Sequence, residues 1–199
     1  MQLKINDIMI PGTLLTKAEA GGVTGLEFLN RVFFPSEGVM LSRIRDVSGV
    51  DGSTLQNWTK RGWVENAPLK RYGIDQVANI LIINMLRSCV RLDHITYLIR
   101  YINGRVDDRS DDIIRESVLY DYICRTLDRL VEEENCSDES IRAIIEEVTA
   151  SYEEVRPGSR ERLNHALCII VMAYYAAVLK HHADDMISDL MRRSEDMFE

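Results

Sequence analysis

The sequence lacks the short motifs by which most enzymes hold a substrate or cofactor. It has no Gly-x-Ser-x-Gly turn, no Gly-rich phosphate loop and no dinucleotide fingerprint. Its four cysteines (Cys89, Cys124, Cys136 and Cys168) are too widely spaced for a zinc or redox pair. We interpret them as small buried residues in a reducing compartment. The sequence therefore predicts no enzymatic activity, no catalytic residue, no metal and no cofactor.

A membrane or secretory signal is also missing. No charged segment followed by an apolar one begins the chain, and Asp7 interrupts Met1–Ile10. The longest apolar run without a charge, Ala166–Leu179, is shorter than the roughly 20 residues that cross a bilayer as a helix. We expect a buried helix there, in a cytoplasmic protein that binds no membrane.

Positive charge is scarce overall, since the net charge is −8, and this argues against a large nucleic-acid footprint. The charge is distributed unevenly, however. Residues 104–199 hold 12 Lys or Arg and 23 Asp or Glu, a net of −11, whereas residues 41–72 hold six basic and three acidic residues, a net of +3. A local basic patch therefore survives within an acidic protein.

What is present is helical periodicity. Residues 1–24 mix glycines with short apolar runs and are interpreted as a loosely docked arm. No strand pattern is convincing after residue 35, apart from a short hairpin or loop at 63–72. Helices are predicted at Gly25–Phe34, 38–48, Ser53–Arg61, from an Asp75 cap to Val90, Asp93–Ile102, 112–134, 138–155 and 159–194.

Two of these helices are short and are separated by Gly49, which is the arrangement of a helix-turn-helix. The second helix of such a motif lies in the DNA major groove and must show polar side chains outward. Gln and Asn can read adenine, and Ser or Thr can hold phosphate. The predicted inner face is Leu41, Ile44, Val47, Val50, Leu55 and Trp58. The predicted outer face is Ser53, Thr54, Gln56, Asn57, Lys60 and Arg61.

At these residues the chain resembles the winged helix-turn-helix of MerR-type regulators. Ser48-Gly49-Val50 is similar to that family's turn, Thr54-Leu55 with Trp58 to its second helix, and Gly62-Trp63-Val64 to its exit. Lys70-Arg71-Tyr72 looks like the end of the wing, which is about five residues shorter here, a length change that surface loops tolerate. Gln56, Asn57 and Thr59 replace the family's Arg, Tyr and acid.

The whole chain also resembles a group of uncharacterised proteins of Gram-positive bacteria, known as domain of unknown function 1836. Gln56–Gly62, Ile80–Leu86 and Leu119-Tyr120 are similar to that group. The resemblance implies a fold and a regulator role but no ligand.

Together these features predict an all-α protein, a MerR-like helix-turn-helix with a short degenerate wing plus a C-terminal helical bundle. The predicted divisions are an N-terminal arm and short helix (1–35), a DNA-binding domain (36–104) and a dimerisation or effector domain (105–199). The expected partner is double-stranded DNA, and the expected assembly is a homodimer. The predicted DNA-binding residues are Arg43, Ser53, Thr54, Gln56, Asn57, Lys60, Arg61, Lys70, Arg71 and Tyr72.

Several alternatives stay open at this point. The protein could instead be an interaction module, with an acidic half that binds a basic partner or an effector and a degenerate helix-turn-helix as scaffold. Trp58 and Trp63 are expected to be core residues rather than base-stacking ones. His181 and Asp185 stand one helical turn apart and could ligate a metal, although a solvated helix end is the favoured interpretation.

Overall fold

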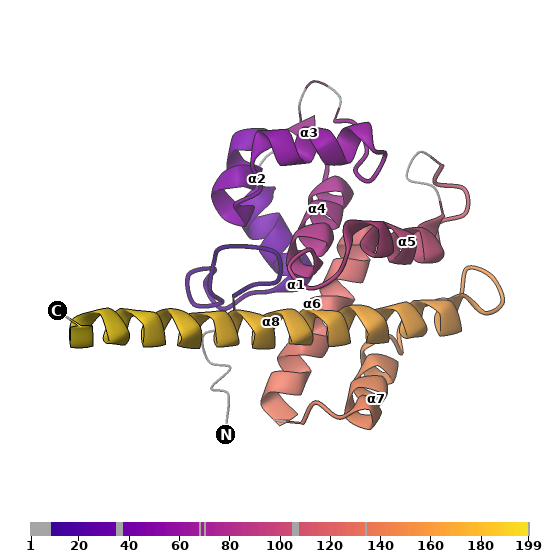
Figure 1. The fold of residues 1–199 in the computed structure, drawn as a ribbon. Coiled ribbons are helices and arrows are strands. Elements are labelled where there is room, and N and C mark those ends of the chain that lie inside the picture. Colours follow the sequence, from indigo (N-terminus) through magenta and orange to yellow (C-terminus); the bar gives the residue numbers. More distant parts are fainter. Residues whose placement is uncertain are drawn as a thin grey trace.

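A computed structural model describes residues 9–34, 38–67, 69, 71–104, 108–133 and 135–198, with side chains described as far as residue 193. Within these ranges the regular secondary structure is helical apart from one pair of two-residue strands and an isolated bridge between Met9 and Thr16 (Figure 1), which confirms the all-α prediction. In chain order the elements are α1 (Gly25–Phe28), the π-helical turn η2 (Leu29–Phe33), β1 (Val39–Met40), α2 (Leu41–Ser48), α3 (Gly52–Lys60), β2 (Arg71–Tyr72), α4 (Ile74–Leu86), α5 (Leu92–Asn103), α6 (Glu116–Glu133), α7 (Asp138–Val148) and α8 (Ser159–Phe198).

Helix α4 forms the centre of the protein. Its residues from Val77 to Ile83 are all buried, because α2, η2, α5, α6 and α8 pack around it. A helix that is apolar on nearly every side needs such complete cover. The predicted boundary at residues 105–112 falls between α5 and α6, yet the hydrophobic core is continuous across it. Helix α4 therefore connects α2, and α3 after it, to the C-terminal helices α6 and α8.

Several predicted helix ends differ from the structure, and two of them are explained by contacts between distant segments. The helix expected at 38–48 begins only at Leu41, because Val39 and Met40 pair as a strand with Tyr72 and Arg71. The helix expected at 138–155 ends at Val148, and Tyr152 beyond it donates a hydrogen bond to the Ile113 carbonyl. In both cases contacts between distant segments outweigh a local pattern that would extend the helix.

The prediction that Asp75 caps α4 was wrong. Gly73 is the N-cap, and its N–H donates to the side-chain oxygen of Gln76. The Asp75 carboxylate instead accepts hydrogen bonds from the backbone and hydroxyl of Ser117 and from Arg115. Asp75 thereby joins α4 to the start of α6.

We predict that Asp75→Ala lowers the free energy of unfolding by about 2 kcal/mol, since hydrogen bonds to a charged group contribute about 1.5–3 kcal/mol. Burial raises the pKa of Asp75, but the bonds from Ser117 and Arg115 outweigh burial and hold it below its usual value. A carboxylate with a lowered folded pKa stabilises the fold above its unfolded pKa of about 3.9 and loses that contribution as the pH falls. Urea unfolding at pH 7 and pH 3 should show the wild-type advantage shrinking at the lower pH. An equal difference at both values would contradict this role.

The N-terminal segment is not loosely docked along residues 9–16, contrary to expectation. Ile10 is only 1% exposed, and a Cβ at Gly12 would overlap the backbone of Leu81. Asn84 of α4 donates to the carbonyls of both Gly12 and Ser48, at 2.9 Å each. The segment is thus a strap that is bonded to α4 and lies against the end of α2.

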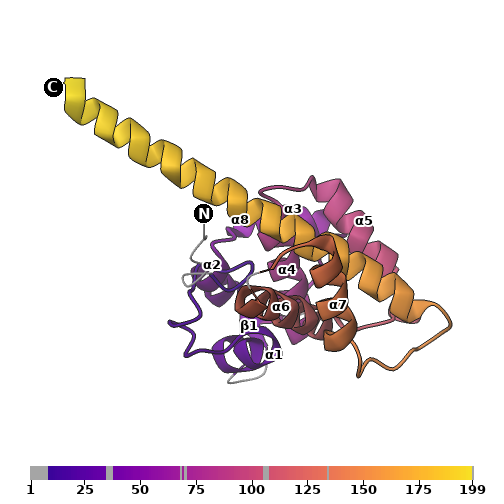
Figure 2. The same ribbon diagram turned by 90° about the horizontal axis from the view of Figure 1, so that it is seen from below.

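Helix α8 crosses the body of the protein and then extends beyond it toward the C-terminus (Figure 2). The described part, Ser159–Arg193, is long and apolar enough to cross a membrane by length and composition, and 44% of its most apolar window is buried in the fold. Core helices of soluble proteins pass the same test, so this result places the protein neither in nor outside a membrane.

Candidate nucleic-acid interface

The turn between α2 and α3 is built by three local features. Gly49 ends α2 in the left-handed conformation, with φ of 70°, which glycine adopts without strain. The Ser48 hydroxyl donates to the Ile44 carbonyl and accepts from the Val50 N–H. Ile44 and Val50 themselves are fully buried. The chain therefore changes direction sharply between α2 and α3.

Helix α3 begins at a strong cap. The Asp51 carboxylate accepts from the Thr54 N–H at 2.8 Å and from the hydroxyls of Ser53 and Thr54 at 2.6 and 2.8 Å. The hydrogen bond from Ser53 is the largest cause that holds the pKa of Asp51 far below its usual range, followed by those from Thr54. The hydroxyls of Ser53 and Thr54, which the sequence predicted as phosphate contacts, thus donate hydrogen bonds to the Asp51 cap in the free protein.

The two faces of α3 separate as the sequence predicted. Leu55 is buried, and Trp58 is only 2% exposed, so Trp58 is a core residue as expected. Gln56, Asn57 and Lys60 are exposed. Helix α3 lies at one edge of the molecule, with α7 at the opposite edge (Figure 1). The outer face of α3 is uncovered by the acidic helices.

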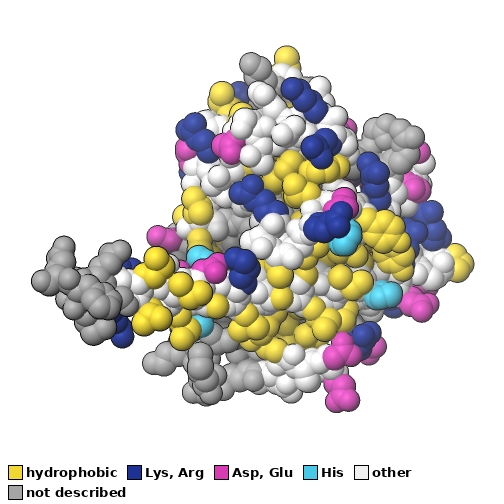
Figure 3. All heavy atoms as spheres, viewed as in Figure 1, with side chains coloured by type: hydrophobic (Ala, Val, Ile, Leu, Met, Phe, Trp, Pro, Cys, Tyr) yellow, Lys and Arg dark blue, Asp and Glu magenta, His cyan; other side chains and the backbone are white. Residues whose placement is uncertain are grey.

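The remaining predicted cations are placed around the ends of the motif. Arg61 is exposed just after α3, and its guanidinium lies 5.0 Å from the centroid of the half-buried Trp63 ring. Arg43 on α2 is exposed but donates to the carbonyl of Val32 at 3.0 and 3.2 Å. A phosphate would therefore compete with Val32 for Arg43, whereas Lys60 can turn toward solvent. Figure 3 shows dark blue basic side chains on the part of the surface that includes α3.

The segment expected to form a short hairpin or loop at 63–72 contains no hairpin among its described residues. Its last two residues, Arg71 and Tyr72, form β2 and pair with β1, which precedes α2. Arg71 is exposed, while burial raises the pKa of the half-buried Tyr72 hydroxyl. Lys70, the third residue predicted at this wing, lies outside the described residues. As far as the structure describes this region, its one regular feature is the antiparallel pair of β1 and β2.

Sequence reasoning missed one cation beside α3. Arg87 follows α4, and its guanidinium carbon lies 5.7 Å from the centroid of the Trp58 ring. A cation over an indole face is attracted by the ring quadrupole. No local pattern marks Arg87, because the contact depends on how α4 crosses α3.

The alternative of a metal at His181 and Asp185 has little geometric support. The two side chains are exposed, and His181 Nε2 lies 3.7 Å from Asp185 Oδ2. Over the described part of the chain, no group of three or more His, Cys, Asp or Glu side chains is arranged to hold a metal ion.

Comparison with known proteins supports the resemblance to the uncharacterised group. The family described as "Domain of unknown function (DUF1836)" matches residues 28–123, which run from the end of α1 into α6. The protein of Bacillus subtilis (strain 168) named "Uncharacterized protein YkrK" is 24% identical over 166 residues, which cover 78% of this chain and 71% of YkrK. No solved structure matches the chain.

Proposed function

We propose that this protein is a cytoplasmic DNA-binding regulator without enzymatic activity, in which α2 and α3 act as a MerR-like helix-turn-helix. The observation that carries the proposal is the outer face of α3, where Gln56, Asn57 and Lys60 are exposed on a helix whose other face is held in the core. Amide side chains at such positions can form bidentate hydrogen bonds with adenine, and the lysine can contact phosphate.

A single short recognition helix makes few contacts, so we propose that the protein acts as a homodimer, which doubles them over two half-sites. Helix α8 offers the interface. Apolar side chains follow one exposed stripe of α8 at alternating steps of three and four residues, which is the spacing of a coiled-coil seam. The stripe is Ile169, Met172, Ala176, Leu179, Ala183, Met186 and Leu190, and extends over about 32 Å of helix. Figure 3 shows hydrophobic atoms along the part of α8 whose side chains it colours.

An antiparallel pairing of two α8 helices fits this stripe best. In an antiparallel seam Ala176 would lie opposite Met186 of the second copy and Leu179 opposite Ala183, so that these central layers each pair a small side chain with a large one, and Met172 would lie opposite Leu190. A parallel pairing would set Ala176 against its own copy and leave the layer underfilled. The free end of α8, where Leu190 is 65% and Met191 61% exposed, would then rest on the body of the second copy.

The proposal is tested by the affinity of the whole protein for mixed-sequence duplex DNA, measured by fluorescence anisotropy at about 50 and 200 mM salt. A working basic face should lose affinity as salt rises, because binding releases counterions from the phosphates. Selection of bound fragments from random DNA should then yield two half-sites at a fixed spacing.

The second candidate function, an interaction module with an acidic binding half, is favoured by the net charge of −11 over residues 104–199. It predicts no duplex binding at either salt concentration. It also predicts capture of a basic peptide that weakens as salt rises.

A further inference from the structure

A large cavity lies between the helix-turn-helix and the C-terminal helices. Its volume is about 870 Å³, within the 300–1,000 Å³ range of small-molecule pockets. The end of α2, the end of α4, α6, α8 and the N-terminal strap all contribute to its wall. The cavity therefore touches the α2–α3 turn, the central helix α4 and the C-terminal helices, while α3 itself does not line it.

The wall is mainly apolar. Its apolar lining includes Leu127 and Leu130 of α6, Ala177 and Val178 of α8, and Met85 of α4. A cavity of this size with such walls favours an apolar molecule, because burial of apolar surface stabilises a complex by roughly 25 cal/mol for each Å² removed from water.

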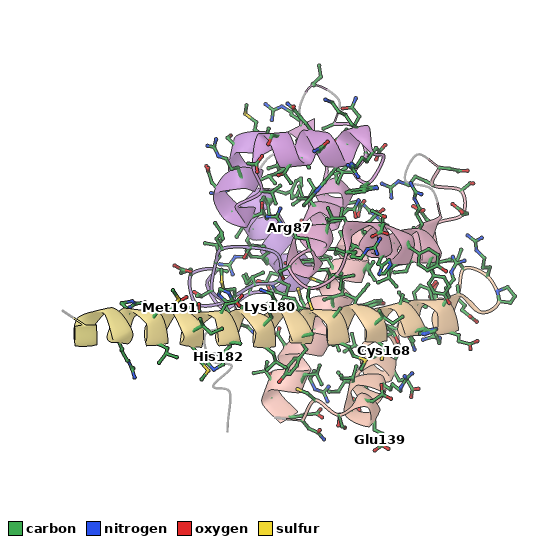
Figure 4. The ribbon with its side chains drawn as sticks, in the orientation of Figure 1. Arg87, Glu139, Cys168, Lys180, His182 and Met191 are labelled. Atoms are coloured by element: carbon green, nitrogen blue, oxygen red, sulfur yellow. The ribbon has the colours of Figure 1, made fainter. Side chains whose placement is uncertain are left out.

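Charged side chains gather at the edge of the cavity. Arg87 is exposed there and has no acidic partner among the described residues; its neighbour is the Trp58 ring. Asp185 also lies at the edge. Its carboxylate oxygen is 3.7 Å from Nε2 of His181, which is its counter-ion when that imidazole is protonated. In Figure 4, Arg87 lies above α8, in the region between α8 and α3. Arg87 is thus the cation at the cavity best placed to receive a new carboxylate.

We infer that this cavity binds a hydrophobic monocarboxylate, with its apolar body between α6 and α8 and its carboxylate on Arg87. An arginine fork can hold a carboxylate through two parallel hydrogen bonds, which is stronger and more directional than a neutral contact. No covalent step is involved. The ligand class follows from the pairing of a mainly apolar wall with a guanidinium that has no acidic partner among the described residues.

Binding would reach the helix-turn-helix by two routes. A carboxylate on Arg87 would draw the guanidinium from the face of Trp58, which packs on the inner side of α3. Ser48 and Gly49 of the α2–α3 turn also line the cavity, and Asn84 ties the turn to the strap. This regulatory part of the inference rests on the proposed DNA-binding function, whereas the binding site does not.

The test is calorimetric titration of the DNA-free protein with dodecanoate, at dodecanoate concentrations too low for micelles to form. Dodecanol is the uncharged probe. Dodecanoate should bind at one site, and Arg87→Met should weaken it about tenfold or more while leaving dodecanol unchanged. Arg100→Met, which removes an exposed arginine of α5 that does not line the cavity, is the matched control and should change neither. Ala177→Leu should weaken both probes by filling the space, with circular dichroism confirming the fold.

Absence of dodecanoate binding to the wild type, or equal binding by wild type and Arg87→Met, would overturn the assignment of the site. In the second stage, saturating dodecanoate should change the duplex affinity at least about fivefold in either direction, the lower end of typical coupling, and should change Trp58 fluorescence. If the protein binds dodecanoate but no duplex, the proposed function fails and the site stands. If it binds both without coupling, only the regulatory part is lost.

Discussion

Lys60→Glu combined with Arg61→Glu should weaken binding to duplex DNA of every sequence about fiftyfold at about 0.1 M salt. The logarithm of the binding constant falls with the logarithm of salt concentration, and each phosphate contact steepens this slope by about 0.9. At about 0.1 M salt, one contact therefore accounts for a factor of about eight in affinity, and the factors of two contacts multiply. The slope should become shallower by about two. Both side chains are exposed at the end of α3, so the fold should be unaffected. Anisotropy titrations over a salt series provide the measurement.

The matched control reverses two exposed arginines on the other side of the molecule, Arg125→Glu with Arg142→Glu. It carries the same change in net charge, and both side chains are at least half exposed on α6 and α7. Gln56→Ala with Asn57→Ala should weaken binding to the selected site alone, since lost base contacts leave nonspecific affinity in place. If both charge reversals weakened binding equally, net charge rather than α3 would be responsible.

Leu190→Asp should convert the proposed dimer to a monomer at micromolar concentration. Each copy would lose about 1.5 kcal/mol of leucine burial, about 3 kcal/mol for the pair, which raises the dissociation constant of the dimer about a hundredfold. Light scattering after size exclusion measures the mass. Specific DNA affinity should fall with dimerisation, because one half-site remains per molecule.

Ser188→Asp is the control for this change, since it adds the same carboxylate two residues away on a different side of the exposed helix. It should leave the mass at that of a dimer. A wild-type protein that is already monomeric, or a Leu190→Asp protein that stays dimeric, would contradict the α8 interface and leave the α3 proposal to stand on its own data.

The parts of the fold that sequence predicted are those specified by near neighbours. Gly49 and the side-chain oxygens after it mark the turn and the start of α3, and both lie where expected. Ser137, directly before the helix predicted from 138, caps α7 by accepting from the Ser140 N–H. Such signals act within four residues along the chain, so the pattern alone reveals them.

What sequence could not predict depends on contacts between distant segments. The strap was predicted to be part of a loosely docked arm, because its partners Leu81 and Asn84 lie some seventy residues later in the sequence. Asp75 was predicted as a cap because its true partners, Arg115 and Ser117, lie about forty residues later, at the start of α6. The cavity and the place of Arg87 follow from the crossing of α4, α6 and α8. Periodicity shows which face is buried but not what covers it.

The most direct test of the central claim is photo-crosslinking from the outer face of α3. The protein would carry p-benzoylphenylalanine in place of Asn57, and in a second preparation in place of Glu146, which is exposed on α7. Irradiation with the selected duplex should produce covalent protein–DNA adducts from position 57 and none from position 146. Adducts from neither position, at a DNA concentration where the duplex is bound, would show that α3 does not face the DNA.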